Sequence, residues 1–417
     1  MTFAAGAATA GLSVTVLALL LLYSPGARAS ELGAPNPGPV ARIADVAHPH
    51  EANETPRSAM NPPAQLHAAG QSLWLDNITR DLLDSGTLSR YIADLSVTGL
   101  TSNPTIYDKA IGGSAAYDDA VSSASRRGLS AEATFFELAL DDLVRAADLF
   151  RPVFDRTLGV DGFVSLEVSP LLAYDAAATA AEAARLHAAG GRPNLFIKIP
   201  GTPEGLPAIE DSIAAGVPIN VTLLFSPAQY LACMDAYTRG VERRVAAGLP
   251  PYVPSVASFF VSRWDAAIAA KVPAELKNGL GLAIGAKAYA DYRAYFGSDR
   301  WGFLLNEGAR PQRLLFASTG TKDPAASDVL YISGLAAPYT VNTMPEDTLH
   351  AFADHGAVPS LLSPDPAGAD AALSAYAAAG IDIDALGHEL QVKGAESFVG
   401  SWNSLIARIE AKATVVA

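Results

Sequence analysis

The sequence predicts an α/β fold in which eight parallel strands and their connecting helices form a (β/α)8, or TIM, barrel with extra helices. Two observations carry this prediction. From about residue 70 onward, short apolar segments alternate with longer segments of helical periodicity, which is the pattern of a parallel sheet with helical crossovers. The apolar segments also number eight, which is the number of strands that closes this kind of barrel.

The predicted strands are short and rich in Val, Ile, Leu and Phe. They cover residues 73–76, 97–101, 162–168, 194–199, 218–224, 252–260, 313–317 and 339–343. In a barrel, alternate side chains of each strand point to the interior or to the surrounding helices. A polar side chain near the carboxyl end of a strand is a candidate for the active site, because TIM barrels carry their sites at that end.

The segments between the strands have helical periodicity. Thr202 is positioned to cap a helix with Pro203 at its first position. Other apolar residues recur at helical spacing and predict buried helix faces: Phe136, Leu140, Leu143, Ala147 and Phe150; Leu206, Ile209 and Ile213; and, in a final helix, Phe398, Trp402, Leu405 and Ile409.

A doubly wound open sheet is the structural alternative. That fold usually has a glycine-rich phosphate-binding turn after its first strand. The segment LDNITRD, residues 75–81, has no glycine, so the barrel is favoured.

Composition excludes several classes of function. The net charge of −14 argues against nucleic acid as a partner, because such a protein needs a basic surface. Cys233 is the single cysteine, so no intramolecular disulfide forms. No His/Cys cluster has metal-ligand spacing and no nucleotide loop follows a strand. We therefore expect neither a metal nor a cofactor.

The first 66 residues differ from the remainder. Residues 12–22 form an apolar run, followed by Ala27-Arg28-Ala29, which resembles a signal-peptide cleavage site but lacks a preceding basic residue. Residues 30–66 are rich in Pro and Ala and are typical of disorder. We interpret residues 1–66 as a leader or a miscalled start upstream of Met60, and residues 67–417 as the barrel. A miscalled start is favoured over export.

A lysine lies within one predicted strand, in the segment NLFIKIP at residues 194–200. Lys198 shares one face of this strand with Phe196, and aliphatic residues take the other face. An ammonium group in an apolar interior is costly to desolvate, so we expect its pKa to fall from about 10.4. An amine with a pKa of about 7–8 attacks carbonyls and forms Schiff bases. The alternative is a lysine that reaches out to solvent.

Polar residues recur on the faces of other predicted strands. Asp76 is in phase with Trp74, and Glu167 with Ser165. Three further pairs share a face: Asn220 with Thr222, Ser258 with Phe260, and Phe316 with Ser318. Each alone has a structural explanation, such as a helix cap or an ion pair. Together they predict a site, because functional groups cluster at one end of a barrel.

These residue types suit Schiff-base chemistry, in which every step moves a proton. Asp76 can take the proton of the hydroxyl whose carbon–carbon bond breaks, and Glu167 with Thr222 can hold a water at the iminium carbon. Asn103 can hold the enamine by hydrogen bonds. Arg263 and Lys322 lie just beyond strand ends, where barrel loops bind phosphate; the alternative for each is ordinary surface charge.

Eight motifs, in order, resemble the transaldolase family, and most closely its longer bacterial branch. The resemblance runs from about residue 71 to the carboxyl terminus through WLDNITRDLL, LTSNPTIYDKAI, FVSLEVSP, NLFIKIP, INVTLLFS, SVASFFVSRWD, LLFASTGTKDP and PYTVNTMPEDTL. It implies a class I aldolase-type barrel in the pentose phosphate pathway. The reaction implied is transfer of a dihydroxyacetone unit from sedoheptulose 7-phosphate or fructose 6-phosphate to glyceraldehyde 3-phosphate or erythrose 4-phosphate.

The resemblance also implies roles for individual residues. Lys198 would be the Schiff-base residue and Asp76 the acid/base. The implied water-positioning pair is Glu167 and Thr222. The implied sugar site contains Thr101, Asn103, Asn220 and Ser258, and the phosphate would meet Arg263 and Ser318.

One position departs from the family pattern. Many relatives have an arginine shortly after the equivalent of Ser318, whereas here the cation is Lys322, further along the chain. A lysine is a point charge and not a planar fork, so phosphate recognition differs in detail.

The nearest alternative activity is that of a fructose-6-phosphate aldolase-type lyase. The aldolase-like branch tends to have Gln in place of Glu167 and Tyr in place of Phe260, so both residues favour the transferase. A non-catalytic, exported sugar-phosphate-binding protein is a third interpretation, which the complete set of reactive residues disfavours. We expect sugar phosphates as partners, a cytoplasmic location unless the leader directs export, and leave a homodimer open.

Overall fold

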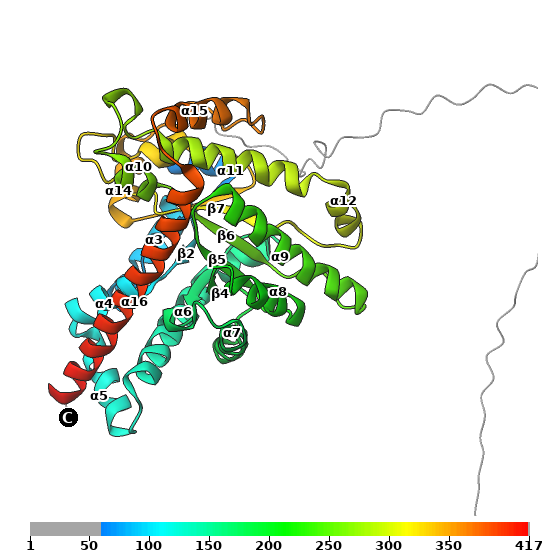
Figure 1. The fold of residues 1–417 in the computed structure, drawn as a ribbon. Helices are drawn as coiled ribbons and strands as arrows, with labels where there is room; N and C mark the ends of the chain where they lie inside the picture. The colour runs from blue at the N-terminus through cyan, green and yellow to red at the C-terminus, as the bar shows by residue number, and fades with distance from the viewer. Residues whose placement is uncertain (1–59, 416–417) are drawn as a thin grey trace, which may run out of the picture. The chain divides into compact units, whose positions relative to one another are not determined.

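A computed structural model describes residues 60–415, in which eight parallel strands form a closed barrel in chain order (Figure 1). Every strand predicted from the sequence is present, so the barrel prediction is confirmed and the doubly wound sheet is excluded. The strands are β1 Gln71–Leu75, β2 Val97–Thr101, β3 Val164–Glu167, β4 Leu195–Pro200, β5 Ile219–Leu224, β6 Ser255–Phe260, β7 Arg313–Ala317 and β8 Thr340–Met344.

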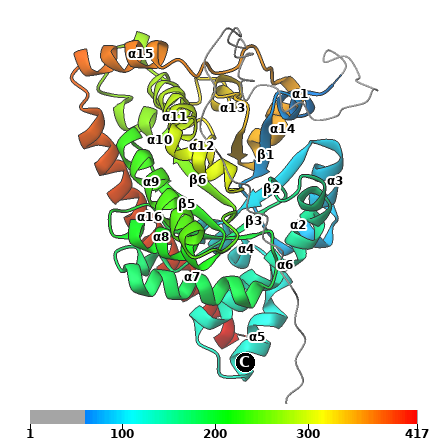
Figure 2. The same ribbon diagram turned by 90° about the vertical axis from the view of Figure 1, so that its right-hand side faces the viewer.

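Helices surround the barrel and connect successive strands (Figure 2). The first half contains α1 Pro62–Ala68, α2 Arg80–Asp84, α3 Thr87–Asp94, α4 Pro104–Gly113, α5 Asp118–Arg126, α6 Ala131–Arg156, α7 Ala176–Gly190 and α8 Gly205–Ala215, with the 3₁₀ turns η3 Ala115–Tyr117 and η4 Pro170–Leu172. The second half contains α9 Pro227–Ala246, α10 Ser262–Ile268, α11 Leu280–Phe296, α12 Asp299–Asn306, α13 Leu330–Gly334, α14 Glu346–His355, α15 Ala367–Ala378 and α16 Ile383–Val415, with η5 Ala274–Leu276.

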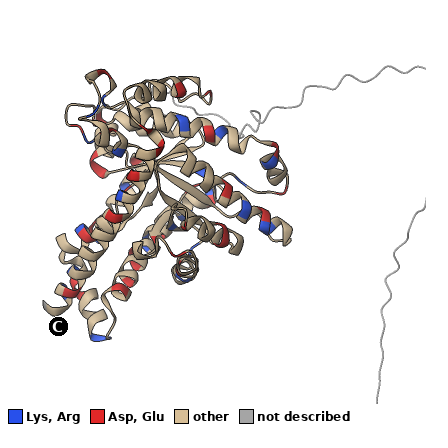
Figure 3. Cartoon of the chain, in the orientation of Figure 1, with Lys and Arg blue, Asp and Glu red and all other residues tan. Residues whose placement is uncertain are grey.

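Most charged residues lie on these helices and their loops (Figure 3). The predicted buried faces of α6 and α16 are confirmed, with Leu140 only partly buried. The predicted helix start at Thr202 is wrong by a few residues. Thr202 Oγ1 accepts a hydrogen bond from Gly205 N, and α8 begins only at Gly205. The reason is that Thr202 closes a turn before the helix.

The helix α1 includes residues 62–66, which the sequence assigned to the leading segment. The rest of that segment, residues 1–59, lies outside the described residues, so its interpretation as a leader or a miscalled start stays a prediction. Between residues 60 and 415, no helix is both long and apolar enough to cross a membrane.

Aromatic side chains fill the barrel interior. Trp74 on β1 lies 6.2 Å, between ring centroids, from Phe196 on β4. Because β1 and β4 are not neighbours in the barrel, this contact crosses its interior, and both rings point inward. Phe163, just before β3, stacks on Phe196 at 4.1 Å. Side chains two residues further along each strand also point inward, as the sequence predicted for Lys198 and Asp76.

Strand register determines which polar residues meet. Glu167 on β3 pairs with Lys198 on β4, and Lys198 pairs in turn with Asn220 on β5. Two residues further along β4, Pro200 pairs with Thr222. Residues in register on adjacent parallel strands point to the same face of the sheet, so an acid, an amine and an amide from three successive strands all face the barrel interior.

Candidate active site

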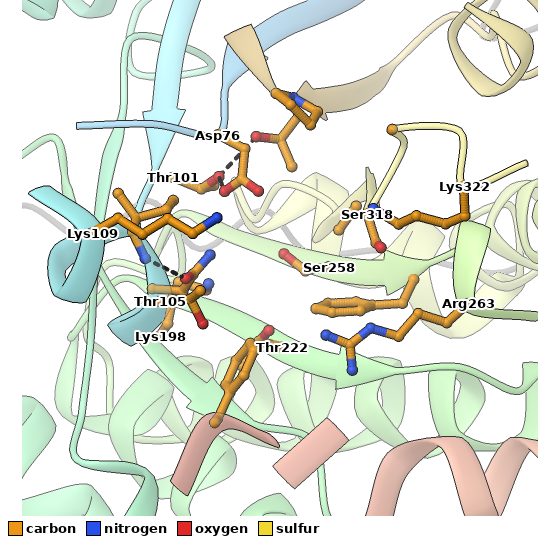
Figure 4. Close-up of a pocket in the computed structure, with 18 residues that line it drawn as sticks. Asp76, Thr101, Thr105, Lys109, Lys198, Thr222, Ser258, Arg263, Ser318 and Lys322 are labelled. Carbon is orange, nitrogen blue, oxygen red and sulfur yellow. Dashed lines mark hydrogen bonds between the residues drawn. The ribbon is translucent and has the colours of Figure 1, made fainter. Parts of the chain in front are cut away.

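A cavity of about 330 Å³ opens at the carboxyl ends of the strands (Figure 4). Its lining contains every candidate residue from the sequence except Glu167 and Asn220. It consists of Asp76, Thr101, Asn103, Thr105, Ile106, Lys109, Lys198, Thr222, Ser258, Phe260, Arg263, Ala317, Ser318, Gly320, Lys322, Thr343, Pro345 and Phe398. Residues from most strands therefore converge on one pocket.

Lys198 is buried in the barrel, with only 4% of its surface exposed. Its Nζ donates a hydrogen bond to the carbonyl oxygen of Ser102 at 3.0 Å and lies 3.1 Å from Glu167 Oε2. The contact with Glu167 is a buried ion pair. The alternative of a lysine that reaches solvent is therefore wrong: the amine is inside the pocket.

Glu167 lies behind the lysine and is also buried. Burial raises the pKa of its carboxyl above the usual range; the charge of Lys198 opposes this shift, and the charge of Asp76 adds to it. A carboxylate with a raised pKa next to an amine can accept the proton of the ammonium form and return it later.

Asp76 follows β1 and faces the pocket. Its Oδ1 accepts a hydrogen bond from Thr101 Oγ1 at 2.8 Å, and Thr101 Oγ1 lies 2.8 Å from Thr343 Oγ1. Desolvation raises the pKa of Asp76, while Lys198 and the hydrogen bond from Thr101 lower it. Its backbone is fixed by a hydrogen bond from Asp76 N to Met344 O. The carboxyl is held in place but keeps oxygen lone pairs for a substrate.

Thr222 lies beside a break in the β5 ladder. The register between β5 and β6 shifts between Val221 and Leu224, and Leu223 has a φ of 60°. A left-handed conformation is strained for a side chain such as leucine. The hydroxyl of Thr222 is buried and has no hydrogen-bond partner among the described residues. The irregular strand thus supports an unsatisfied hydroxyl at the pocket.

The predicted sugar-site residues occupy different depths. Asn103 caps α4, accepting a hydrogen bond from Ile106 N through Oδ1, while its side chain lines the pocket. Asn220 is fully buried beneath the pocket, where it donates to Ser165 Oγ and accepts from Ser258 Oγ at 2.7 Å. Its contact with a substrate would therefore pass through Ser258.

Three cationic side chains besides Lys198 line the pocket. Arg263 lies over the ring of Phe260, with Cζ 5.4 Å from the centroid, and burial lowers its pKa. Partial burial, together with the charge of Arg263, lowers the pKa of Lys322. Lys109, on α4, is the third cation. Within residues 60–415 none of the three forms an ion pair, so the pocket attracts an anion even though the protein is acidic.

Ser318 lies at the end of β7 beside these cations. Its φ is 55°, and its Oγ lies 3.0 Å from Ser262 Oγ. A serine held in the left-handed region is uncommon and points to a functional constraint. Its position fits the phosphate contact that the sequence predicted.

Sequence reasoning missed several lining residues, most of them on helices or loops: Thr105, Ile106, Lys109, Gly320, Pro345 and Phe398. Strand parity could not identify them. Lys109 and Thr105 lie in the quoted LTSNPTIYDKAI motif, which could have drawn attention to them. Across the described part of the chain, no group of three or more His, Cys, Asp or Glu residues could hold a metal.

A family model described as Transaldolase/Fructose-6-phosphate aldolase matches residues 73–409. A transaldolase of Acidothermus cellulolyticus is 47% identical over 357 residues, covering 84% of this chain and 96% of the relative. A transaldolase of Thermobifida fusca is 45% identical over 358 residues, covering 84% and 97%. A transaldolase of Neisseria gonorrhoeae is 42% identical over 345 residues, covering 82% and 98%.

The barrel and its lysine-centred pocket define an enzyme of the Schiff-base-forming aldolase class. The chain belongs to the transaldolase/fructose-6-phosphate aldolase family. The resemblance stated from sequence motifs is confirmed, and the agreement among relatives supports transaldolase activity.

Proposed function

We propose that this chain transfers a dihydroxyacetone unit from sedoheptulose 7-phosphate or fructose 6-phosphate to glyceraldehyde 3-phosphate or erythrose 4-phosphate, as a step of the pentose phosphate pathway. The observation that carries the proposal is the buried Lys198 amine, 3.1 Å from Glu167 and in the same pocket as Asp76.

The first half-reaction begins at Lys198. Glu167 takes a proton from the ammonium, and the free amine attacks the ketose carbonyl at C2. Glu167, with a water held by Thr222, returns a proton to the departing hydroxyl, so that water leaves and an iminium forms. Asp76 then removes the proton of the C4 hydroxyl and the C3–C4 bond breaks. The aldose phosphate departs, and the remaining three-carbon unit stays bound to Lys198 as an enamine.

The second half-reaction reverses these steps with another aldehyde. The enamine carbon attacks the aldehyde, Asp76 gives its proton to the new alkoxide, and water adds to the iminium to release the new ketose. Asn103 and Ser258 hold the three-carbon unit in both halves. Arg263, Ser318 and Lys322 bind the phosphate of donor and acceptor, which is consistent with cations that lack carboxylate partners.

Borohydride reduction in the presence of fructose 6-phosphate tests the proposal. A covalent three-carbon adduct is expected on Lys198, and Lys198→Arg should abolish both the adduct and the transfer. Lys287 is the matched control, because its amine is bound to Asp291 outside the pocket. An adduct on Lys287, or on no residue, would contradict the assignment.

The alternative is a lyase that releases free dihydroxyacetone. Glu167 and Phe260 favour the transferase, and rapid turnover of fructose 6-phosphate without an acceptor would favour the lyase. We also propose a cytoplasmic location and leave a homodimer open. Sequencing of the native amino terminus tests the location, since a start near Ser30 would indicate export. Sedimentation measures the oligomeric state.

A further inference from the structure

The helix α16 lies far from the catalytic strands in sequence but reaches the pocket. Gln391 Nε2 donates hydrogen bonds to Gly201 O, just after β4, and to Leu223 O on β5, each at 2.9 Å. Further along the helix, Ser401 Oγ lies 2.7 Å from Thr105 Oγ1 on α4. The helix is therefore held at Gln391 to β4 and β5, and at Ser401 to α4, the helix that follows β2.

Barrel order determines what lies beneath the helix. The strands run β2, β3, β4, β5 around the barrel. A helix that joins the end of β5 to the helix after β2 must pass over β3 and β4, which carry Glu167 and Lys198. The contact of α16 with η4, which follows β3, agrees with this path.

Phe398 lies between these two contacts along the helix. Gln391, Gly394, Phe398 and Ser401 follow at spacings of three and four, so they share one helix face. Phe398 is 5% exposed and is the one α16 residue in the pocket lining among the described residues. Its neighbour Trp402 packs against Phe135 and Phe136 of α6, which fixes the helix at that point.

Gly394 allows the close approach of the helix. A Cβ atom at this position would lie 3.0 Å from Leu223 Cδ2 and 3.5 Å from Arg263 Nη1. The helix backbone thus lies directly against the strand end beside Thr222 and against a pocket cation. A helix packed this closely against the strand end can hold the ring of Phe398 at a fixed place in the pocket wall.

We propose that Phe398 is a specificity-determining residue, which excludes water from the enamine and thereby sets the ratio of transfer to release of free dihydroxyacetone. The inference rests on the proposed function. Phe260, whose ring centroid lies 5.2 Å from that of Phe225, is the other aromatic residue of the pocket wall. The two rings flank a pocket in which most other lining side chains are polar.

The enamine has two competing fates. It attacks an acceptor aldehyde, which forms a carbon–carbon bond and takes a proton from Asp76 onto the alkoxide. Otherwise its C3 carbon takes a proton from water, and the hydroxide or a second water adds to the iminium carbon. Dihydroxyacetone is then released and the Lys198 amine is restored. Removing an aromatic ring from a pocket wall that also carries the unsatisfied hydroxyl of Thr222 opens a space that water enters, so the second fate becomes faster.

The test measures dihydroxyacetone released from fructose 6-phosphate relative to transfer to erythrose 4-phosphate. Phe398→Ala is expected to raise this ratio about tenfold, a change of about 1.4 kcal/mol in relative barrier height, and Phe398→Leu to raise it less. In D₂O, each dihydroxyacetone released in this way gains one deuterium at its protonated carbon, so the amount of singly deuterated product should rise with the ratio. Borohydride trapping on Lys198 should persist in both variants.

Leu405→Ala is the matched control, since Leu405 is a buried α16 residue outside the pocket. An unchanged ratio in Phe398→Ala, or an equal rise in Leu405→Ala, overturns the inference. If the wild-type protein itself gives no transfer and no Lys198 adduct, then the proposed function fails instead.

Discussion

The two ends of β1 each meet an aspartate, and the two aspartates have opposite surroundings. Asp161, at the floor of the barrel, is 3% exposed and accepts hydrogen bonds from Ser72 Oγ, Trp74 Nε1 and Gly162 N. Asp76, at the mouth, accepts one side-chain hydrogen bond, from Thr101.

The same contrast holds for two arginines. Arg313, at the floor, donates to Ser72 Oγ, Thr340 O and Val160 O. Arg263, at the mouth, has no acceptor among the described residues and lies over an aromatic ring. Asp161 and Arg313 at the floor have their hydrogen bonds within the protein, whereas Asp76 and Arg263 at the mouth retain bonding capacity for a substrate. Under the proposed mechanism, the floor stabilises the barrel and the mouth carries out the chemistry.

The largest difference between substitutions of the two aspartates is expected in kcat. Asp76→Asn keeps the hydrogen bond from Thr101 but removes the base, so kcat should fall about 10²–10⁴-fold, while borohydride still traps the Lys198 adduct. Asp161→Asn should leave kcat within a few-fold of wild type. Coupled-enzyme assays measure kcat for both variants. A normal kcat for Asp76→Asn would contradict the proton-transfer role of Asp76.

Substitutions of the two arginines should differ in their effect on substrate affinity. Arg263→Gln removes a charge-assisted contact worth about 1.5–3 kcal/mol, so KM for fructose 6-phosphate should rise about 10–100-fold. Arg313→Gln is the matched control and should leave KM unchanged. Initial-rate kinetics with phosphorylated and unphosphorylated ketoses decide the point, because an equal loss with both would argue against phosphate binding by Arg263.

For stability we expect the opposite: substitution of the floor aspartate should lower the free energy of unfolding more than substitution of the mouth aspartate. Asp161→Asn places an amide donor against the Ser72 or Trp74 donor, and a buried donor without an acceptor costs about 1–3 kcal/mol. Urea unfolding should therefore show a lower free energy of unfolding for Asp161→Asn than for wild type. Asp76→Asn should cause no such loss at pH 7. If the mouth variant were the less stable of the two, the comparison would be reversed.

Strand parity explains why the sequence predicted the mouth better than the floor. Lys198 and Thr222 lie on short strands and Asp76 directly follows one, so alternation alone gives their direction, and the barrel then brings them together. Asp161 lies in a loop before β3, and nothing local indicates that it reaches Ser72 and Trp74. Its role depends on a contact between segments almost 90 residues apart.

Pocket residues on helices were beyond prediction for a related reason. The sequence identified the apolar stripe of α16, including Phe398, but a stripe does not distinguish a core contact from a pocket wall. The path of α16 over β3 and β4 depends on Gln391 reaching two backbone carbonyls. The irregular backbone at Leu223 and Ser318 likewise has no signature in residue type, because neither residue is a glycine.

The smallest expected effect is the pH dependence of stability at the mouth. The pKa of Asp76 is raised, with desolvation as the main cause. The folded state therefore keeps this proton at pH values where the unfolded state, with a pKa of about 3.9, has lost it. Since the unfolded state binds fewer protons in that range, wild-type stability falls as the pH rises from about 4 through the raised pKa.

The Asp76→Asn variant has an amide that carries no such proton, so it isolates this effect. The free energies of unfolding of wild type and variant should differ by a constant amount below about pH 4, with wild type losing stability relative to the variant as the pH increases. Each unit of pKa shift corresponds to about 1.4 kcal/mol. A relative gain by wild type over the same range would mean that Lys198 and Thr101 outweigh desolvation. In that case the fold would stabilise the mouth aspartate in its charged form.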